Sequence, residues 1–355
     1  MPIHVVLLGG GLAGTFLAAR LCAAGQQVTL IDDRSPHSAS RVAAGMYNVI
    51  TGRFGAKSWL ADTLLAEIEA FFSLSLCQEA RQYLHPTEIY RPFKTVEEYN
   101  KWTGRAEDPA FAHLVRFQEQ PLLPEQLINP HGGIRIQGCG WVDTGRMIDA
   151  LLHHLELHHH LRRLTGYLSY DSIDLEARTV QLRGERLAFD HLVCCEGHQF
   201  THNPWFDHVR LIPNKGEILE IAAPELHLPF ALSKKVYLVP VGGDRWVCGA
   251  TYANQFDHPD PTPEGRAEIE SYLQKAICVP YQVTAHWAGI RPTTPNRRPI
   301  VGTHPAWPHL HVLTGFGTKG ILLGPYTARL LTERLLGSDP ALPPEADVQR
   351  FWPAA

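Results

Sequence analysis

Apolar and glycine positions divide the start of the chain into three predicted elements. The apolar run Val5–Leu8 is typical of a short buried strand. After a glycine-rich turn, apolar residues recur at helical spacing until Gly25, which predicts the end of a helix. A second apolar run, Val28–Ile31, predicts another strand. Together these elements predict a βαβ unit with parallel strands.

Helix and strand patterns continue along the rest of the chain. Helical spacing predicts further helices over residues 58–74, from about residue 141, over 264–275 and over 321–336, with Asp143 or Thr144 as the N-cap of the second. Strand patterns are found at Thr179–Leu182, Phe189–Gly197 and His311–Thr314. Two further runs predict a hairpin around the turn Gly242–Asp244: Tyr237–Pro240 and Trp246–Thr251.

The order of these patterns predicts two domains. Pieces typical of nucleotide-binding folds occur in three separate parts of the chain, and strand-rich segments lie between them. We therefore predict an α/β fold with a discontinuous, Rossmann-type dinucleotide-binding domain formed by residues 1–80, 140–200 and 285–355. An inserted antiparallel-sheet (α+β) substrate domain is predicted over residues 81–139 and 201–284.

Composition narrows the class of protein. The chain has 355 residues, of which 45% are hydrophobic and 19% charged, as in globular proteins of about two domains. Its formal net charge of −4 argues against a nucleic-acid partner. The sequence contains no uninterrupted apolar run of about 18 residues, so no membrane span is expected. The seven cysteines are scattered and form no C-x-x-C pair, so we expect a reduced, cytoplasmic protein.

Three glycines of the first turn match the G-x-G-x-x-G pattern of dinucleotide-binding proteins. Gly9 permits the tight turn after the strand, Gly11 lets the backbone approach a pyrophosphate, and Gly14 allows close packing of the helix on the sheet. The pattern follows a predicted strand and opens a predicted helix, which is the context it requires.

The helix that follows the glycines completes the predicted binding site for the dinucleotide. Its first residues, Leu12 and Ala13, offer backbone N–H groups to an anion at the positive end of the helix dipole. Asp32 follows the second strand, at the distance expected for an acid that binds a ribose hydroxyl. The motif alone does not separate NAD from FAD.

Four separated stretches resemble the D-amino-acid oxidase superfamily of FAD-dependent oxidoreductases, and their pattern is most similar to glycine oxidase and sarcosine oxidase. The stretches are Gly9–Gly14 with Asp32, Ser40–Met46, Leu192–Gly197, and Ala288–Gly302 followed by Gly315–Gly320. The four stretches occur in the same order as in the family, and together they extend over nearly the whole chain. The resemblance therefore implies FAD rather than NAD.

The resemblance also implies which residues contact FAD. Ser40–Met46 would line the pyrophosphate and pass the flavin ring. Ala44 and Gly45 are small enough for a close approach, and Gly45 could also supply the unusual φ that such an approach needs. Arg41 would be either paired with a phosphate or solvated. Gly197 matches the family, whereas Glu196 departs from it. We expect the Glu196 carboxylate to point away from the diphosphate or to accept a hydrogen bond from a hydroxyl or backbone N–H. The last helix would begin at the pyrimidine end of the flavin, and its contacts would come from Gly317, Thr318, Lys319, Gly320 and Ile321.

Three residues are implied on the substrate side. Arg291 matches the family's arginine that holds the substrate carboxylate, and Tyr237 matches a substrate-contacting tyrosine of glycine oxidase. Lys319 would place a cation beside the reduced flavin, and we take Lys319 or Lys215 as the charge that assists reaction with O₂. Further pocket candidates are Asn48, Tyr252 and Trp287.

The implied activity is oxidation of a C–N bond in a small amine or amino acid. Hydride transfer to flavin N5 would give an imine, and O₂ or another acceptor would reoxidise the flavin. We expect non-covalent FAD, because residues 292–311 contain no cysteine that could attach it. The sequence leaves open the substrate, its stereochemistry, the electron acceptor and the oligomeric state.

Other functions remain open at this stage. A 2-hydroxy-acid dehydrogenase would use the same arginine, and a flavin-bearing subunit would leave the chemistry to a partner. Flavin-dependent editing of a tRNA base is disfavoured by the net charge. His154 and His158 have the i, i+4 spacing of metal ligands, but we expect the polar face of a helix there and no metal site.

Overall fold

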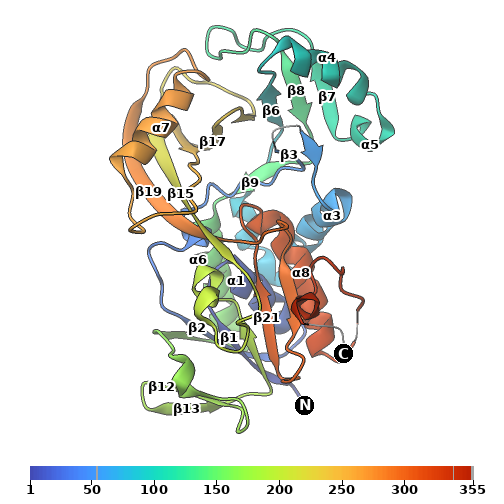
Figure 1. The fold of residues 1–355 in the computed structure, drawn as a ribbon, viewed down its shortest axis with the longest axis vertical. Coiled ribbons are helices and arrows are strands. Elements are labelled where there is room, and N and C mark those ends of the chain that lie inside the picture. The colour runs from blue at the N-terminus through green and yellow to red at the C-terminus, as the bar shows by residue number, and fades with distance from the viewer. Residues whose placement is uncertain (53–54, 339, 353–355) are drawn as a thin grey trace.

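A mostly parallel sheet forms the lower half of the molecule in Figure 1. The computed structural model describes residues 1–52, 55–338 and 340–352. The six strands of this sheet follow the order β10 (Leu161–Thr165), β2 (Gln27–Asp32), β1 (His4–Leu8), β14 (His191–Cys194), β21 (Leu310–Thr314) and β20 (Ile300–Thr303). Only the last pair is antiparallel. The central strands are buried, which explains their unbroken apolar runs.

Helices pack against this sheet and against one another. They are α1 (Leu12–Ala23), α3 (Ala61–Phe72), α6 (Thr144–His158) and α8 (Gly320–Leu335). Phe16 of α1 meets Phe71 of α3 edge-on with ring centroids 4.8 Å apart. A Cβ atom at Gly324 would lie 2.3 Å from the Phe16 ring, so α8 approaches α1 closely because residue 324 is glycine. The predicted helices are confirmed, and Asp143 is the N-cap of α6 through its bond from the Arg146 N–H.

A second sheet of eight strands forms the upper half (Figure 1). Its order is β19 (Gln282–Thr293), β15 (Ile212–Ala222), β18 (Arg245–Gly249), β17 (Tyr237–Gly242), β16 (Ala231–Ser233), β6 (Ile89–Pro92), β8 (Gly133–Ile136) and β7 (Val115–Gln118). All neighbours are antiparallel except β16 and β6. The predicted hairpin is confirmed, with Tyr237 opposite Gly249. Helix α7 (Pro263–Leu273) lies beside β15, and two short helices flank the other end: α4 (Val96–Arg105) and α5 (Pro109–Ala112).

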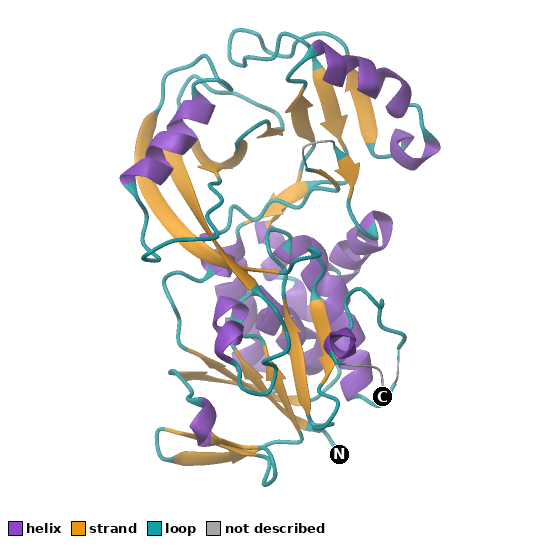
Figure 2. Cartoon of the chain, viewed as in Figure 1, coloured by secondary structure: helices purple, strands orange, loops and turns teal. Residues whose placement is uncertain are grey.

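The remaining elements are short. The remaining strands are β3 (Ile50–Thr51), β4 (Ala56–Lys57), β5 (Leu84–Pro86), β9 (Gly140–Val142), β11 (Ile173–Asp174), β12 (Thr179–Leu182) and β13 (Glu185–Ala188). The remaining helical turns are α2 (Ala39–Val42), η1 (Ser75–Cys77), η2 (Ala80–Tyr83), η3 (Tyr170–Ser172), η4 (Gly197–His202) and η5 (Val348–Phe351). Strands β3 and β9 lie between the two large sheets, whereas β12 and β13 lie at the bottom of the molecule in Figure 1, and Figure 2 shows the same view by secondary structure.

The predicted α/β fold class is confirmed, with a Rossmann-type parallel sheet beside a mostly antiparallel one. Strands of the lower sheet all come from the ranges predicted for the dinucleotide-binding domain. In the upper sheet, β19 runs through residue 285 without interruption and carries its last residues toward the lower sheet. The domain boundaries themselves stay a prediction.

Two further observations concern metals and membranes. The rings of His154 and His158 lie 4.8 Å apart on α6, and within the described ranges no group of three or more His, Cys, Asp or Glu side chains is arranged to hold a metal ion. Absence of a metal site therefore stays a prediction. None of the helices in the described residues is long and apolar enough to cross a bilayer.

Buried histidines predict that acid will destabilise the fold. His311, 2% exposed, bonds to His191 at 2.9 Å and to Thr303 at 3.0 Å, and burial lowers the pKa of both histidines. Below about pH 6.5 the unfolded chain therefore binds protons that the folded chain does not, and stability falls by about 1.4 kcal/mol per pH unit for each such histidine. Urea unfolding at several pH values below neutrality should show this loss. A His311→Gln variant should lose less stability with acid, and equal slopes would contradict the assignment.

Candidate active site

One large cavity lies between the two sheets. Its volume is about 1220 Å³, above the roughly 300–1,000 Å³ of sites for drug-sized ligands. Its lining includes the first glycine turn, the Ser38–Gly52 segment and the Gly315–Leu322 segment, together with residues of β15, β17 and β19. Nearly every residue predicted to bind the cofactor or the substrate lines it, although most are far apart in sequence.

The N-terminal turn has the geometry that its glycines predict. Gly9 has φ +104°, and a Cβ atom there would lie 2.4 Å from the Cys195 carbonyl oxygen. A Cβ atom at Gly14 would lie 2.0 Å from the Gly9 carbonyl oxygen. Both positions therefore require glycine because neighbouring backbone approaches them. Such a turn exposes the first N–H groups of α1 to the cavity.

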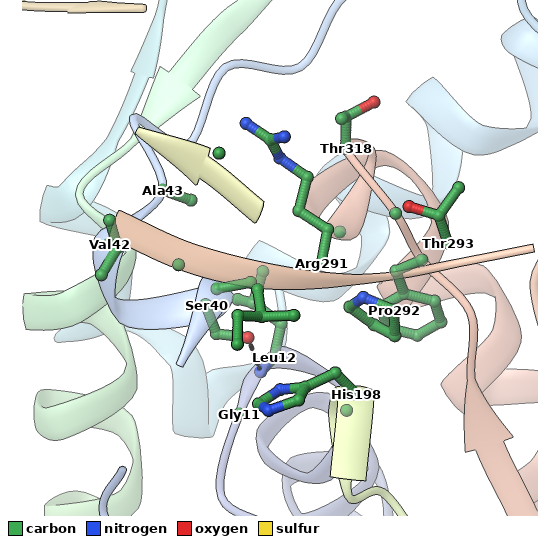
Figure 3. A pocket seen from close by; sticks show the side chains of 18 of the residues that line it. Gly11, Leu12, Ser40, Val42, Ala43, His198, Arg291, Pro292, Thr293 and Thr318 are labelled. Carbon is green, nitrogen blue, oxygen red and sulfur yellow. Dashed lines mark hydrogen bonds between the residues drawn. The ribbon is translucent and has the colours of Figure 1, made fainter. Parts of the chain in front are cut away.

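The Ser40 side chain lies at the N-terminus of α1 and bonds to its first N–H group. Its Oγ accepts from the Leu12 N–H at 3.0 Å, as the dashed line in Figure 3 shows. Gly11 is the N-cap, and its missing side chain leaves room for this hydroxyl. A hydroxyl at this position satisfies an N–H group that a phosphate could also use. The predicted neighbourhood of Ser40 and the glycine turn is thus present.

The two charged residues predicted near the dinucleotide have protein partners. Asp32 lines the cavity, and its Oδ1 accepts from the Gly10 N–H at 3.0 Å. Arg41 also lines the cavity, but its two Nη atoms donate to the carboxylate of Asp149 on α6 at 2.9 and 3.2 Å. A phosphate contact by Arg41 stays a prediction and would have to share the guanidinium with Asp149.

Glu196 is held away from open solvent. Tyr170 donates its hydroxyl to Oε1 at 2.8 Å, and Asn203 donates to Oε2 at 3.0 Å. Burial raises the pKa of this carboxyl group, although both hydrogen bonds act in the opposite direction. The expected bond from a hydroxyl is confirmed. Gly197, with φ +60°, follows directly and lines the cavity.

The segment of small residues passes close to β9. Gly45 has φ +66°, and a Cβ atom there would lie 1.8 Å from the Val142 carbonyl oxygen. The predicted unusual φ is present, and its structural cause is this contact with β9. Ala44 and Met46 line the cavity on either side.

Lys319, the N-cap residue of α8, lines the cavity. Its Nζ donates to Ser58 Oγ at 2.9 Å, and Ser58 is 8% exposed. Burial, followed by the positive charges of Arg298 and Arg297, lowers the pKa of Lys319 to about 8. The other predicted residues of this turn also line the cavity: Gly317, Thr318, Gly320 and Ile321.

Arg291 lies in the cavity on the upper sheet. Its Nη1 donates to Asn214 Oδ1 at 2.7 Å and to the Thr251 carbonyl oxygen at 3.1 Å. In Figure 3 the side chain extends to one side of β19, whereas Gly11, Leu12 and Ser40 lie to the other side. Tyr237 on β17 lines the same cavity, and burial raises the pKa of its hydroxyl, which therefore stays neutral and can donate a hydrogen bond.

Two expectations are corrected by the structure. Trp287, proposed for the pocket, is not among the described residues that line it; it lies nearer the start of β19 and is 40% exposed. Lys215, proposed to face oxygen, is 3% exposed and pairs with Glu217 at 3.1 Å. Because side chains alternate along β15, Asn214 and Gly216 face the cavity and Lys215 faces the opposite side. Asn48 and Tyr252 do line the cavity.

Several residues of the site were not predicted, among them Asn214, Gly216 and Ser58. Asn214 and Gly216 occupy alternate positions of β15, with the charged residues Lys215 and Glu217 on the other face, and this period of two could have separated the two faces. Ser58 gives no such signal, because only the fold brings it to Lys319.

These residues fit a long dinucleotide. Crowded glycines and the N-terminus of α1 lie at one end of the cavity, and Arg291, Tyr237 and Lys319 lie along the rest. Such an arrangement can hold a pyrophosphate at α1 and a small anion at Arg291. It leaves room for a flat ring between them, beside Gly45 and the start of α8.

Comparisons with known proteins agree with this description. A family model described as FAD dependent oxidoreductase (DAO) matches residues 4–334. The chain is 27% identical to the bifunctional protein ThiO/ThiG of Nostoc sp.. It is 24% identical to the tRNA 5-methylaminomethyl-2-thiouridine biosynthesis bifunctional protein MnmC of Marinobacter nauticus. It is 23% identical to the glycine oxidase of Pseudomonas aeruginosa. These matches cover 96%, 93% and 97% of this chain.

The fraction of each relative's length that this chain covers differs among them. It covers 54% and 55% of the two bifunctional proteins, about half their length, but 98% of the glycine oxidase. A solved glycine oxidase from Geobacillus kaustophilus has the same fold, with a TM-score of 0.82, 22% identity, and 96% and 97% of the two chains covered. The family match identifies FAD as the cofactor of this chain. This chain belongs to the DAO family of FAD-dependent oxidoreductases.

Proposed function

We propose that this protein oxidises the C–N bond of a small amine or amino acid that carries a carboxylate. The observation that carries the proposal is Arg291, a half-buried guanidinium in the FAD cavity that has unused donors. FAD, when bound, supplies the acceptor for a hydride. The product would be an imine, which water hydrolyses.

The residues of the chain bind and orient the substrate. Arg291 would hold the carboxylate through paired hydrogen bonds and so fix the direction of the α carbon. Tyr237 would donate its neutral hydroxyl to a polar group of the substrate. No side-chain base is required if the amine arrives deprotonated.

An amine is favoured over a hydroxy acid by the similar proteins, since two of those described above are glycine oxidases. Product analysis tests this choice. The FAD-loaded protein should release ammonia or an alkylamine together with an oxo acid from glycine, sarcosine or alanine. Turnover of glycolate alone would favour the 2-hydroxy-acid dehydrogenase, and turnover of none would favour a flavin-bearing subunit.

A tRNA-bound amine is the second candidate, because of the similarity to MnmC. The formal net charge of −4 favours a free small molecule. Bulk tRNA should therefore neither bind the protein nor compete with the small amines in the same assay.

Lys319 is proposed to assist reaction with O₂ through its positive charge. Lys319→Met is expected to lower the rate constant for reoxidation by O₂ at least about tenfold, because the cation that stabilises negative charge is removed. Since the pKa is about 8, the wild-type rate should also fall as the pH rises through that value and the charge is lost. Stopped-flow reoxidation measures both effects. Lys57→Met, which removes a lysine paired with Asp62, is the control; wild-type kinetics in Lys319→Met would refute the role.

Two smaller proposals complete this description. FAD is held without a covalent bond, since Cys195 is the one cysteine among the described residues lining the cavity and it lies beside the N-terminal glycine turn. Cytoplasmic location is supported by the seven cysteines, all of which are free.

A further inference from the structure

The guanidinium of Arg291 is only partly satisfied by the protein. Both hydrogen atoms on Nη1 have acceptors, namely Asn214 Oδ1 at 2.7 Å and the Thr251 carbonyl oxygen at 3.1 Å. Within the described part of the chain, no group accepts from Nε or Nη2. One edge of the guanidinium therefore remains available, and Nε and Nη2 are the pair of donors that can hold a carboxylate side-on.

The side-chain amide of Asn214 is also held at its nitrogen end. It is 4% exposed, and its Nδ2 donates to Asn254 Oδ1 at 2.7 Å. Because Nδ2 is used as a donor to Asn254, the amide presents Oδ1 to Arg291. The orientation of this amide is therefore set before any substrate arrives.

The segment that supplies Thr251 and Asn254 is tied to β15. The backbone groups of Ala253 and Lys215 bond to each other in both directions, at 2.8 and 2.9 Å. The Thr251 N–H also donates to the Glu217 carbonyl oxygen at 3.2 Å. These bonds hold the segment after β18 against β15, so the Thr251 carbonyl oxygen that accepts from Nη1 has a fixed position.

Contacts with the rest of the guanidinium restrict its position further. A Cβ atom at Gly216 would lie 1.8 Å from Nη2, so the guanidinium lies directly against the β15 backbone. The ring of Tyr252 lies 4.6 Å from Cζ, within the range of a cation–π contact. Since Asn214, Gly216 and Tyr252 all line the cavity, they surround Arg291 on the substrate side of the sheet.

We infer that Asn214 is a positioning residue: it holds Nη1 of Arg291 so that the Nε–Nη2 edge faces the cavity and binds a small monocarboxylate side-on. The inference rests on the proposed function and adds how its carboxylate is selected and oriented. Loss of the Asn214 acceptor would let the guanidinium rotate, and a carboxylate would then bind more weakly and in a different direction.

The test uses acetate as the probe, titrated into FAD-loaded protein by isothermal titration calorimetry. Asn214→Ala is expected to weaken acetate binding about tenfold. Asn214→Asp keeps the size of the side chain and an acceptor for Nη1 but adds a charge that competes for Arg291, so it should also weaken acetate at least about tenfold. Because Asp also lacks the N–H that Asn214 donates to Asn254, the thermal midpoint of this variant is compared with its acetate affinity, and a loss of affinity without a matching loss of stability supports the positioning role. Asn254→Ala leaves both Nη1 acceptors in place and removes only the group that fixes the Asn214 amide, so it should weaken acetate binding less than Asn214→Ala does.

The outcomes separate the inference from the proposed function. If Arg291→Ala loses acetate binding but both Asn214 variants bind it as wild type does, the inference is overturned and the carboxylate role of Arg291 stands. An equal loss in Asn254→Ala and Asn214→Ala would also overturn it, since general packing would then explain both. If wild type and Arg291→Ala bind acetate equally, the proposed function loses its main support. Thermal midpoints and FAD content confirm that each variant is folded.

Discussion

Replacing Arg291 with alanine should raise KM for carboxylate-bearing amines about 100-fold or more, equivalent to about 3 kcal/mol. The reason is the geometry of the clamp. Asn214 and Thr251 hold one end of the guanidinium, and the other end is the charged donor pair in the cavity. Alanine removes that pair and also leaves the buried acceptor of Asn214 without its partner. We therefore expect kcat/KM to fall by at least as much as KM rises, because the α carbon is no longer oriented.

Two variants make this result specific. Arg291→Lys keeps the charge but loses the planar pair of donors, and should recover only part of the affinity. Arg297→Gln changes an exposed arginine of the nearby turn and should leave KM within about twofold of wild type. Steady-state kinetics with glycine and sarcosine provide the measurement. Unchanged KM in Arg291→Ala would remove Arg291 from the substrate site.

Gly11→Asp should separate cofactor binding from folding. Gly11 is the N-cap of α1 with an ordinary φ of −75°, and a Cβ atom there meets only the Ser40 side chain, with Oγ at 2.9 Å. Aspartate is a favourable N-cap and offsets the loss of the displaced Ser40 hydroxyl, so apo-protein stability should stay within about 1 kcal/mol of wild type. A carboxylate at this helix end would nevertheless repel a pyrophosphate by about 4 kcal/mol at 4 Å in a partly screened environment. FAD affinity should therefore fall at least about 100-fold.

Gly11→Ser is the matched control for that experiment. Serine also caps the helix but adds no charge, so it should weaken FAD binding far less. Quenching of flavin fluorescence by the apo-protein gives the dissociation constants, and thermal unfolding gives the stability. Wild-type FAD affinity in Gly11→Asp would mean that the pyrophosphate does not lie at the N-terminus of α1.

Local chemistry made much of the site predictable from the sequence. The glycine turn, the acid after β2 and the cap of α6 are set by neighbouring residues, and the positive φ of Gly45 follows from the same kind of reasoning. The family resemblance placed Arg291 and Tyr237, because those residues stand in recognisable motifs. Each of these predictions depends on few residues close together in the chain.

Contacts between distant parts of the chain were not predictable in this way. Asn214 meets Arg291 only because β15 and β19 pair with those two residues in register, and Ser58 meets Lys319 only through tertiary packing. Trp287 was placed wrongly because a strand pattern does not show where the strand leaves a cavity. Lys215 was placed wrongly although the alternation along β15 distinguishes its face from that of Asn214.

Anaerobic mixing tests the central claim most directly. FAD-loaded protein is combined without oxygen with glycine, sarcosine, D- and L-alanine, methylamine and glycolate, and the visible flavin absorbance is followed. The proposed function predicts that at least one amine bearing a carboxylate bleaches the flavin, that methylamine and glycolate do not, and that Arg291→Ala shows no bleaching at the same concentration. Bleaching by glycolate or methylamine alone, or by none of the six compounds, would contradict it.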